Sequence, residues 1–339
     1  MMKILKFDEI KKTDWEHLVE RSSVATWFQT SSAYSFYRTI SFFEPFCFGV
    51  ESDGRVNGVI VGFVLKDRNP LKNFFSRRAI VYGGPLLADD IEDKELAFLL
   101  TTCRNALKKK AIYLEFRNLN DYSRWKPFSA SYGFQYQPHY DIHINTSSMD
   151  VVNENMGKSR KRDIRVSMRD GASIITDPTL AQVREFYVIL KNLYETKVRT
   201  PLFPLEYFEK LYEIEASSFL LIQYEGKIIG GMVCVGLPGV AVYEMYVCGM
   251  DGVYKNIFPS EVATYAGLKF AAENGYPKFD MMGAGAPDDG GYGVRDFKLK
   301  FGGELLELGR VIAIYEPLMY RIGKIAVKIM KIRPRLPFE

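Results

Sequence analysis

An internal repeat constrains the fold most: the second half of the chain repeats the order of segments in the first half. Residues 219–237 (FLLIQYEGKIIGGMVCVGL) resemble residues 47–65 (CFGVESDGRVNGVIVGFVL), with the turn glycines Gly54 and Gly226 at matching positions. Apolar runs on both sides of a short glycine turn predict a β-hairpin in each half. With only two copies, the pattern indicates a duplicated unit rather than a many-copy array.

Helical segments follow both hairpins. Residues 94–110 and 260–275 have helical periodicity, and short strands follow at 113–118 and 278–283. Helices interleaved with hairpins predict an α/β (α+β) fold with two mixed sheets, not a doubly wound parallel sheet. A length of 339 residues also fits two domains.

Composition limits the class of protein. An apolar content of 47% is ample for packed cores, and a net charge of +4 means that an anion site must come from local clustering. The four cysteines lie far apart inside apolar runs, which is typical of reduced core residues in a cytosolic protein. The N-terminus has no secretory apolar core and no apolar run is long enough to span a membrane, so we expect a soluble protein.

The segment 279–303 is the strongest candidate for a functional site. Its glycines, among them Gly283 and Gly290, would let a loop close over a ligand. In the repeat, Lys298 corresponds to Ser129, so the fold tolerates a small neutral residue at that position. We therefore expect the side chain of Lys298 to face outward between Phe297 and Phe301, and a Lys298→Ala variant to fold normally but to lose function.

Other charged residues of the repeat suggest where a cleft lies. Glu115 and Arg117 in the first copy correspond to Asp280 and Met282 in the second. This divergence predicts a cleft shared by the two halves.

Two basic segments are candidates for anion or surface binding. On a helix, Lys158, Arg162, Arg165 and Arg169 would share one face, with Ile164 and Met168 toward a core. This face is either solvated or an anion site, because arginine suits bidentate phosphate contacts. The C-terminal segment from 316 to 335 predicts a basic amphipathic helix, whose apolar stripe either packs on the body or docks on a membrane surface.

Other kinds of site have weaker support. His139, Asp141 and His143 alternate on one predicted strand and could line up as metal ligands, but a half-exposed strand is the simpler interpretation, and we assign no metal. No strand–GxxxxGK[ST]–helix order and no GxSxG motif occurs, which argues against a P-loop ATPase and a serine hydrolase.

Several motifs together resemble the Fem-type (FemABX) aminoacyltransferases, which build the interpeptide bridges of peptidoglycan. The motifs are FQTSSAY (28–34), RKRDIRVSMRDGA (160–172), FDMMG (279–283) and DFKLKFGGELLELG (296–309). The resemblance covers nearly the whole chain and is most specific at 157–175 and 279–303. It implies two tandem GNAT-like domains, at 1–147 (completed by a C-terminal helix, 317–339) and at 148–316.

The same resemblance implies an activity. The family transfers an amino acid from aminoacyl-tRNA, as co-substrate, to the peptide amine of a nucleotide- or lipid-linked cell-wall precursor, and needs no cofactor. Such an enzyme would be cytoplasmic, with the inner face of the cell membrane as a second location if the C-terminal helix docks there. This sequence has Gly83–Gly84–Pro85 where the family often has Arg–Gly–Pro.

Residue roles follow from the motif positions. Lys298 matches the lysine of the family's FK-x-x-F motif at the reacting centre, where an ammonium could stabilise a developing oxyanion. Glu115 is the carboxylate that could orient or deprotonate the accepting amine. The remaining cations are candidates for substrate binding, with Arg38 and Arg199 at positions where the family binds the precursor's phosphates. These cations are Arg38, Arg117, Arg162, Arg165, Arg199 and Arg295.

Two alternatives stay open. The first is an N-acyltransferase that uses acetyl-CoA or another acyl-CoA and acts on an envelope polysaccharide or lipid precursor. The stretch after YEMYV, CGMDGVYKN, lacks the [RQ]-x-x-G-x-[GA] pattern that cradles the CoA pyrophosphate, which favours a different donor. The second is a non-catalytic protein that binds cell-wall precursors through the same cations.

Overall fold

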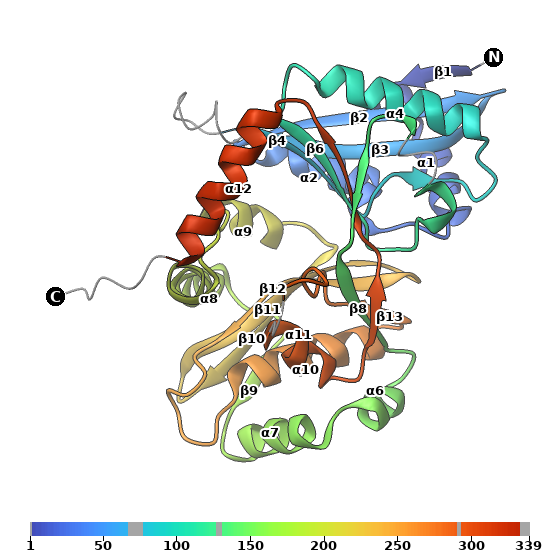
Figure 1. Cartoon of the computed structure of the whole chain (residues 1–339). Helices are drawn as coiled ribbons and strands as arrows, with labels where there is room; N and C mark the ends of the chain where they lie inside the picture. The colour runs from blue at the N-terminus through green and yellow to red at the C-terminus, as the bar shows by residue number, and fades with distance from the viewer. Residues whose placement is uncertain (1, 67–76, 127–130, 290–292, 333–339) are drawn as a thin grey trace.

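The computed structural model describes residues 2–66, 77–126, 131–289 and 293–332, with side chains to residue 326. Ser129, Gly290, Gly291 and residues 333–339 of the expected C-terminal helix lie outside this part. Two mixed sheets form the molecule, one above the other in Figure 1. Among the described residues, no helix is long and apolar enough to cross a membrane.

The first sheet has the order β1-β2-β3-β4-β6-β15-β7. Its strands are β1 (Met2–Leu5), β2 (Phe43–Ser52), β3 (Arg55–Leu65), β4 (Arg78–Tyr82), β6 (Tyr113–Arg117), β15 (Arg310–Ile314) and β7 (Gln135–Gln137), and the short β5 (Leu86–Leu87) pairs with β3. The helices and helical turns of this half are η1 (Phe7–Glu9), α1 (Lys12–Glu20), η2 (Trp27–Gln29), α2 (Ser31–Thr39), α4 (Asp93–Leu107) and η3 (Ser123–Trp125).

The second sheet repeats this order as β9-β10-β11-β12-β13-β8-β14. Its strands are β9 (Ser173–Ile175), β10 (Ser217–Tyr224), β11 (Lys227–Leu237), β12 (Ala241–Gly249), β13 (Lys278–Asp280), β8 (Tyr140–Asn145) and β14 (Glu304–Glu307). Its helices are α6 (Met149–Asn155), α7 (Lys158–Arg169), α8 (Leu180–Leu193), η4 (Tyr194–Val198), α9 (Leu205–Tyr212), α10 (Pro259–Glu273) and α11 (Gly293–Leu299). The last helix, α12 (Pro317–Ile332), contacts the first half through Tyr320, which packs against Tyr113.

Hairpin geometry confirms the duplication. The turn between β2 and β3 has positive φ at Asp53 and Gly54, and the turn between β10 and β11 has positive φ at Glu225 and Gly226. Two consecutive residues with φ > 0 form the type I′ turn that suits a tight hairpin. Both hairpins also shift register two residues before the turn, at Glu51 and Gln223. Among the strands that the structure describes, each sheet has one parallel pair, β4–β6 and β12–β13, so both sheets are mixed as expected.

Two strands are exchanged between the halves. β7 lies in the first sheet, but β8, which follows it directly, pairs with β13 and β14 in the second. In the same way β14 lies in the second sheet and β15 pairs with β6 and β7 in the first. The expected domain boundaries at 147 and 316 stay a prediction, but residues 140–145 and 310–314 each lie in the opposite sheet from the one those boundaries give them.

Aromatic residues fill the space between the halves. Phe43 of β2 stacks on Phe63 of β3 and also meets Phe203, which precedes α9. Phe36 of α2 meets Tyr207 of α9. These rings belong to, or for Phe203 pack against, one buried cluster that continues through both sheets, so the two halves share a core.

Candidate functional site

A cavity of about 230 Å³ lies where the exchanged strands pass between the sheets. The two crossing segments touch there, because the amides of Leu308 and Gly309 donate to the carbonyl oxygen of His139. In Figure 1 the green segment that leads into β8 and the red segment that leads into β15 run between the two sheets. Residues of both halves line the cavity, among them Arg117 and Met282, so the cleft expected from the repeat is confirmed.

The first sheet lines the cavity with three arginines, Arg78, Arg117 and Arg310. Glu115 orients two of them: Arg117 Nε donates to Glu115 Oε2 at 2.9 Å, and Arg310 Nη1 to Glu115 Oε1 at 2.9 Å. Burial by itself raises the pKa of Glu115, but the two guanidinium groups outweigh it and lower the pKa to about 2. So acidic a carboxylate is a weak base, and the geometry favours orientation of the arginines over removal of an amine proton.

His139 joins this wall and not a group of metal ligands. Arg310 Nη2 lies 3.0 Å from His139 Nε2, and because arginine only donates, Nε2 is the acceptor and the ring is neutral. Burial and the charge of Arg310 lower the pKa of His139 to about 4. Of the three residues that the alternation suggested as metal ligands, His139 is therefore separate from Asp141 and His143.

The pKa of His139 predicts how stability depends on pH. Its folded-state pKa lies below the ordinary value of 6.5, so the unfolded state binds the proton first as the pH falls. The free energy of unfolding should therefore drop between about pH 6.5 and pH 4, by at most about 3 kcal/mol. We expect about half of that, since the ring is partly exposed and screened by solvent. Urea unfolding of wild type and His139→Asn at pH 4.5 and 7.5 measures this loss in the free energy of unfolding. An equal pH dependence in both proteins would contradict the lowered pKa of His139.

The second sheet lines the cavity with a buried carboxyl, Asp141 of β8, which is 3% exposed. Its Oδ1 accepts hydrogen bonds from the amides of Ile142 and Gly283, both at 2.7 Å. Burial and the nearby charge of Asp280 raise the pKa of Asp141 well above its ordinary value. Gly283 has a φ of +107°, so this close approach depends on a backbone conformation that glycine adopts without strain.

The repeat explains why this side of the cavity is acidic. Ile312 of β15 pairs with Glu115, and His143 of β8 pairs with Asp280, so β15 and β8 are equivalent strands. Two residues before these positions stand Arg310 in the first half and Asp141 in the second. The arginine that neutralises Glu115 is thus replaced by a carboxyl beside Asp280.

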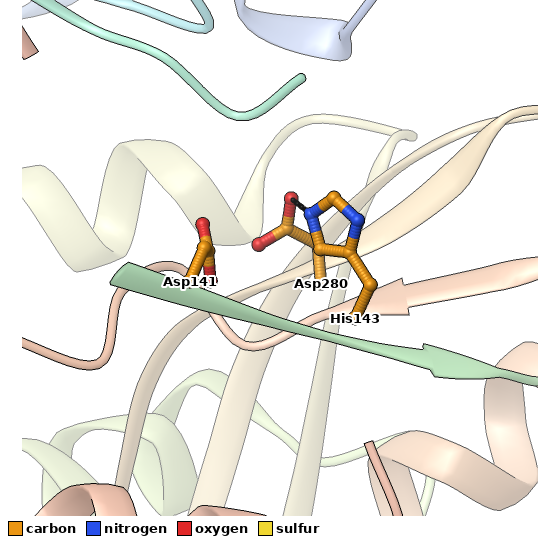
Figure 2. A group of neighbouring side chains, drawn as sticks. All are labelled: Asp141, His143 and Asp280. Carbon is orange, nitrogen blue, oxygen red and sulfur yellow. Dashed lines mark ion pairs between the residues drawn. The ribbon is translucent and has the colours of Figure 1, made fainter. Parts of the chain in front are cut away.

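Asp141, His143 and Asp280 form a compact group in which both carboxyls are buried and His143 is partly exposed (Figure 2). His143 Nε2 lies 3.1 Å from Asp280 Oδ2, and potential ligand atoms of all three residues lie within 4.8 Å of one another. This spacing would fit a cation, but the ammonium of Lys298 already lowers the pKa of Asp141 through its positive charge. Since an ammonium already acts on this group, we do not propose a metal site.

Lys298 does not face outward, and that expectation is wrong. It is 8% exposed, and its Nζ donates to the carbonyl oxygens of Met281 and Gly283, the latter at 3.1 Å. Its third contact is an ion pair with Glu244 Oε1 at 3.2 Å. The ammonium therefore fixes the backbone on both sides of Met282. Met282 and Gly283 line the cavity, whereas Lys298 does not.

The counterpart that the repeat assigns to Lys298, Ser129, lies outside the described residues. The two phenylalanines beside Lys298 do pack together, with centroids 5.4 Å apart. The cation over their rings is Arg160 of α7, which also pairs with Glu261 at 2.5 Å. Arg160 was not singled out from the sequence.

The other expected binding residues lie outside the cavity lining. Arg295 donates to the carbonyl oxygens of Ala284 and Ala286 and so fixes the loop after β13. Arg199 directly precedes Thr200 and Pro201, which line the cavity, whereas Arg38 is exposed at the end of α2.

The predicted basic face of α7 does not line the cavity. Arg162 pairs with its neighbour Asp163, and Arg165 is exposed, on a helix at the opposite end of the molecule from the first sheet (Figure 1). Met168 is 39% exposed, so its expected place toward the core is wrong, whereas Ile164 is buried. Of the six predicted binding cations, only Arg117 lines the cavity.

Sequence reasoning missed Arg78 and Arg310. Arg310 meets Glu115 only because β15 crosses into the first sheet, and 195 positions separate the two residues. The alternation over residues 139–143 did mark His139 and Asp141, but as candidate metal ligands. If the exchange of β8 and β15 had been foreseen, two cations at strand ends opposite the Glu115–Arg117 pair would have indicated Arg78 and Arg310.

Comparison with known proteins shows the fold. No protein-family model and no curated protein matches the chain. Among solved structures it is similar to FemX, with a TM-score of 0.71 and 14% identity over 94% of this chain and 99% of that one. It is also similar to L-PGS from Bacillus licheniformis (TM-score 0.58, 14% identity, 95% and 98% covered). A tandem GNAT protein from the clavulanic acid biosynthesis pathway gives a TM-score of 0.58 at 12% identity, with 93% and 99% covered. The chain therefore has the Fem-type fold of two tandem GNAT-like halves.

Proposed function

We propose that this protein is a Fem-type acyltransferase that moves an amino acid from aminoacyl-tRNA to the peptide amine of a nucleotide- or lipid-linked cell-wall precursor. The observation that carries the proposal is the cavity between the halves, where three arginines face one buried carboxyl. The similarity to FemX and to L-PGS over nearly the whole chain supports the same class of reaction. Because the donor is a tRNA, the reaction would take place in the cytoplasm, on the way to peptidoglycan.

The arginine wall would bind the anionic part of the acceptor. Guanidinium groups bind carboxylates and phosphates through paired hydrogen bonds. Arg117 and Arg310 are held in place by Glu115, so they are oriented before a substrate arrives. In this proposal Glu115 is a positioning residue and not the general base.

Asp141 would take the amine proton. The amine nitrogen attacks the ester carbonyl carbon, a C–N bond forms, and the C–O bond to the tRNA ribose breaks. One proton passes from the amine to Asp141 Oδ2 and from there to the departing ribose oxygen, so that the products are an amide and a free hydroxyl. Lys298 would act indirectly, because its hydrogen bonds fix the backbone at Met281 and Gly283 beside this carboxyl.

The starts of two helices argue against CoA as donor. A pyrophosphate commonly binds at a helix N-terminus, where free amides and the helix dipole attract anions. At the start of α10 the amide of Ser260 donates to Asp251 Oδ1 at 3.1 Å, and Pro259 has no amide hydrogen. At the start of α4, the amide of Glu92 donates to Glu95 and Asp93 adds a further negative charge. Acidic side chains thus stand where the pyrophosphate would have to bind.

This arrangement predicts that acetyl-CoA does not stabilise the protein. A ligand at about 100 times its Kd raises the free energy of unfolding by about 2.7 kcal/mol, which a thermal shift assay detects. We expect no saturable rise in Tm with acetyl-CoA. A saturable rise that an Asp251→Asn variant enhances would favour the CoA-dependent alternative.

The proposal is tested by transfer from a charged tRNA pool, labelled in its amino acids, to purified nucleotide-linked and lipid-linked precursors. Acetyl-CoA is supplied in parallel as the competing donor. Transfer from tRNA supports the proposal and identifies the amino acid, whereas acetyl transfer replaces it. Precursor binding without turnover from either donor would support a non-catalytic binding protein.

A further inference from the structure

The C-terminal helix α12 exposes an apolar stripe. Leu318 is 67% exposed, Ile322 43% and Ile325 59%. These three residues are spaced by four and three positions, so they lie on one face of the helix. They account for three of the large apolar side chains that the described part of the chain leaves exposed, and they adjoin one another.

The opposite face of α12 holds the helix to the body. Tyr320 packs edge-on against Tyr113 of β6 with centroids 5.2 Å apart, and its hydroxyl lies 3.4 Å from Gln137 Nε2. At 3.6 residues per turn, Tyr320 points roughly opposite to Leu318 and Ile322, which are each two positions away. Of the two alternatives for the stripe, packing on the body is therefore wrong for its described residues.

One flank of the stripe is basic. Arg321 and Lys324 are exposed, and the sequence places Lys328 and Lys331 at the same spacing further along. No acidic residue occurs from 317 to 332. An apolar stripe with cations along its edge is the pattern of a helix that lies in the interface of an anionic bilayer.

We propose that α12 is a docking surface for an anionic membrane, with Leu318, Ile322 and Ile325 inserted among the acyl chains and Arg321 and Lys324 against the headgroups. Charge complementarity selects this occupant: a protein groove would have to be acidic as well as apolar, whereas an anionic bilayer offers both properties over any area. This inference does not depend on the proposed transferase activity. It also differs from membrane spanning, for which α12 is too short.

Vesicle co-sedimentation of the full chain tests the proposal. We expect binding to vesicles of phosphatidylcholine with about one-third phosphatidylglycerol, weaker binding as salt increases, and little binding to phosphatidylcholine alone. The Arg321→Gln/Lys324→Gln variant should bind about 30-fold more weakly, from the usual contribution of two cations near such a surface. The triple variant Leu318→Ser/Ile322→Ser/Ile325→Ser should lose binding.

Matched controls separate docking through α12 from nonspecific hydrophobic binding and from misfolding. Val188 of α8 and Val253 are 66% and 59% exposed elsewhere on the surface, so Val188→Ser/Val253→Ser should bind vesicles like wild type. All these side chains are exposed, and Tm should hardly change in any variant. Equal binding by wild type and the triple variant would overturn the proposal. So would a wild-type dimer in solution that the triple variant makes monomeric, because the stripe would then be a contact between two copies.

Discussion

An Asp141→Asn variant should lose transfer by about 10²- to 10⁴-fold, the range that a positioned general base contributes. Asparagine keeps an oxygen that can accept from the amides of Ile142 and Gly283, so the wall of the cavity should survive. It lacks only the ability to take a proton. The measurement is the single-turnover rate of amide formation with saturating precursor.

The same substitution should not destabilise the protein. The folded-state pKa of Asp141 is raised by burial and by Asp280, so its ionisation opposes folding as the pH rises above the ordinary carboxyl pKa. Asparagine removes that cost, and Tm at pH 8 should equal or exceed that of wild type. Lower activity with equal or higher stability is the combination expected of a residue kept for chemistry.

Asp280→Asn is the matched control. Asp280 is fully buried and lies outside the cavity lining, but its charge raises the pKa of Asp141. Removing it should lower that pKa and move the acid limb of the pH–rate profile to lower pH. The other groups around Asp141 are Lys298, His143, Lys278 and Tyr243. Wild-type rates and an unchanged pH profile in Asp141→Asn would rule out its role.

Local patterns were enough to predict the duplicated hairpins and the mixed sheets. The matching runs at 47–65 and 219–237 carry the same turn chemistry, and the structure has the same hairpin and the same register shift in both. Such features depend on residues that are neighbours in the sequence, so the sequence alone predicts them. The exchange of β8 and β15 depends on long-range pairing, and no local pattern records it.

The candidate site was predicted only in part, because some of its residues are neighbours in the sequence and others are not. Glu115 and Arg117 are two positions apart on one strand, and their place beside a cleft shared by the two halves could be inferred. Arg310 and Asp141 come to the site on the exchanged strands. Their equivalence becomes visible only when the two sheets are compared strand by strand.

The direction of Lys298 shows what residue type alone cannot decide. A lysine between two phenylalanines on a short helix is compatible with either an exposed or a buried ammonium. The outcome depends on Glu244, a buried carboxylate on β12 that is distant in sequence, and on the carbonyl groups of the loop after β13. Burial of a charge requires such partners, and they are not adjacent in the sequence.

A Lys298→Met variant should be strongly destabilised, contrary to the normal folding expected from the sequence. Methionine keeps the length of the side chain but leaves Glu244, 4% exposed, without its cation. Breaking a buried ion pair in this way typically costs about 3–5 kcal/mol. The backbone at Met281 and Gly283 would also lose its donor. Urea unfolding measures the cost, and a free energy of unfolding within about 1 kcal/mol of wild type would contradict it.

The double variant Lys298→Met/Glu244→Gln decides whether the ammonium is structural or chemical. Glutamine removes the unpaired charge, so the double variant should recover much of the stability, and the double-mutant cycle gives the coupling between the two residues. If Lys298 only positions the loop, transfer should recover together with stability. A double variant that is as stable as wild type but still inactive would show instead that the ammonium itself takes part in the reaction, as the Fem-type motif implies. Glu244→Gln alone is the remaining corner of the cycle, and because it leaves Lys298 with its two carbonyl acceptors it should cost less than Lys298→Met.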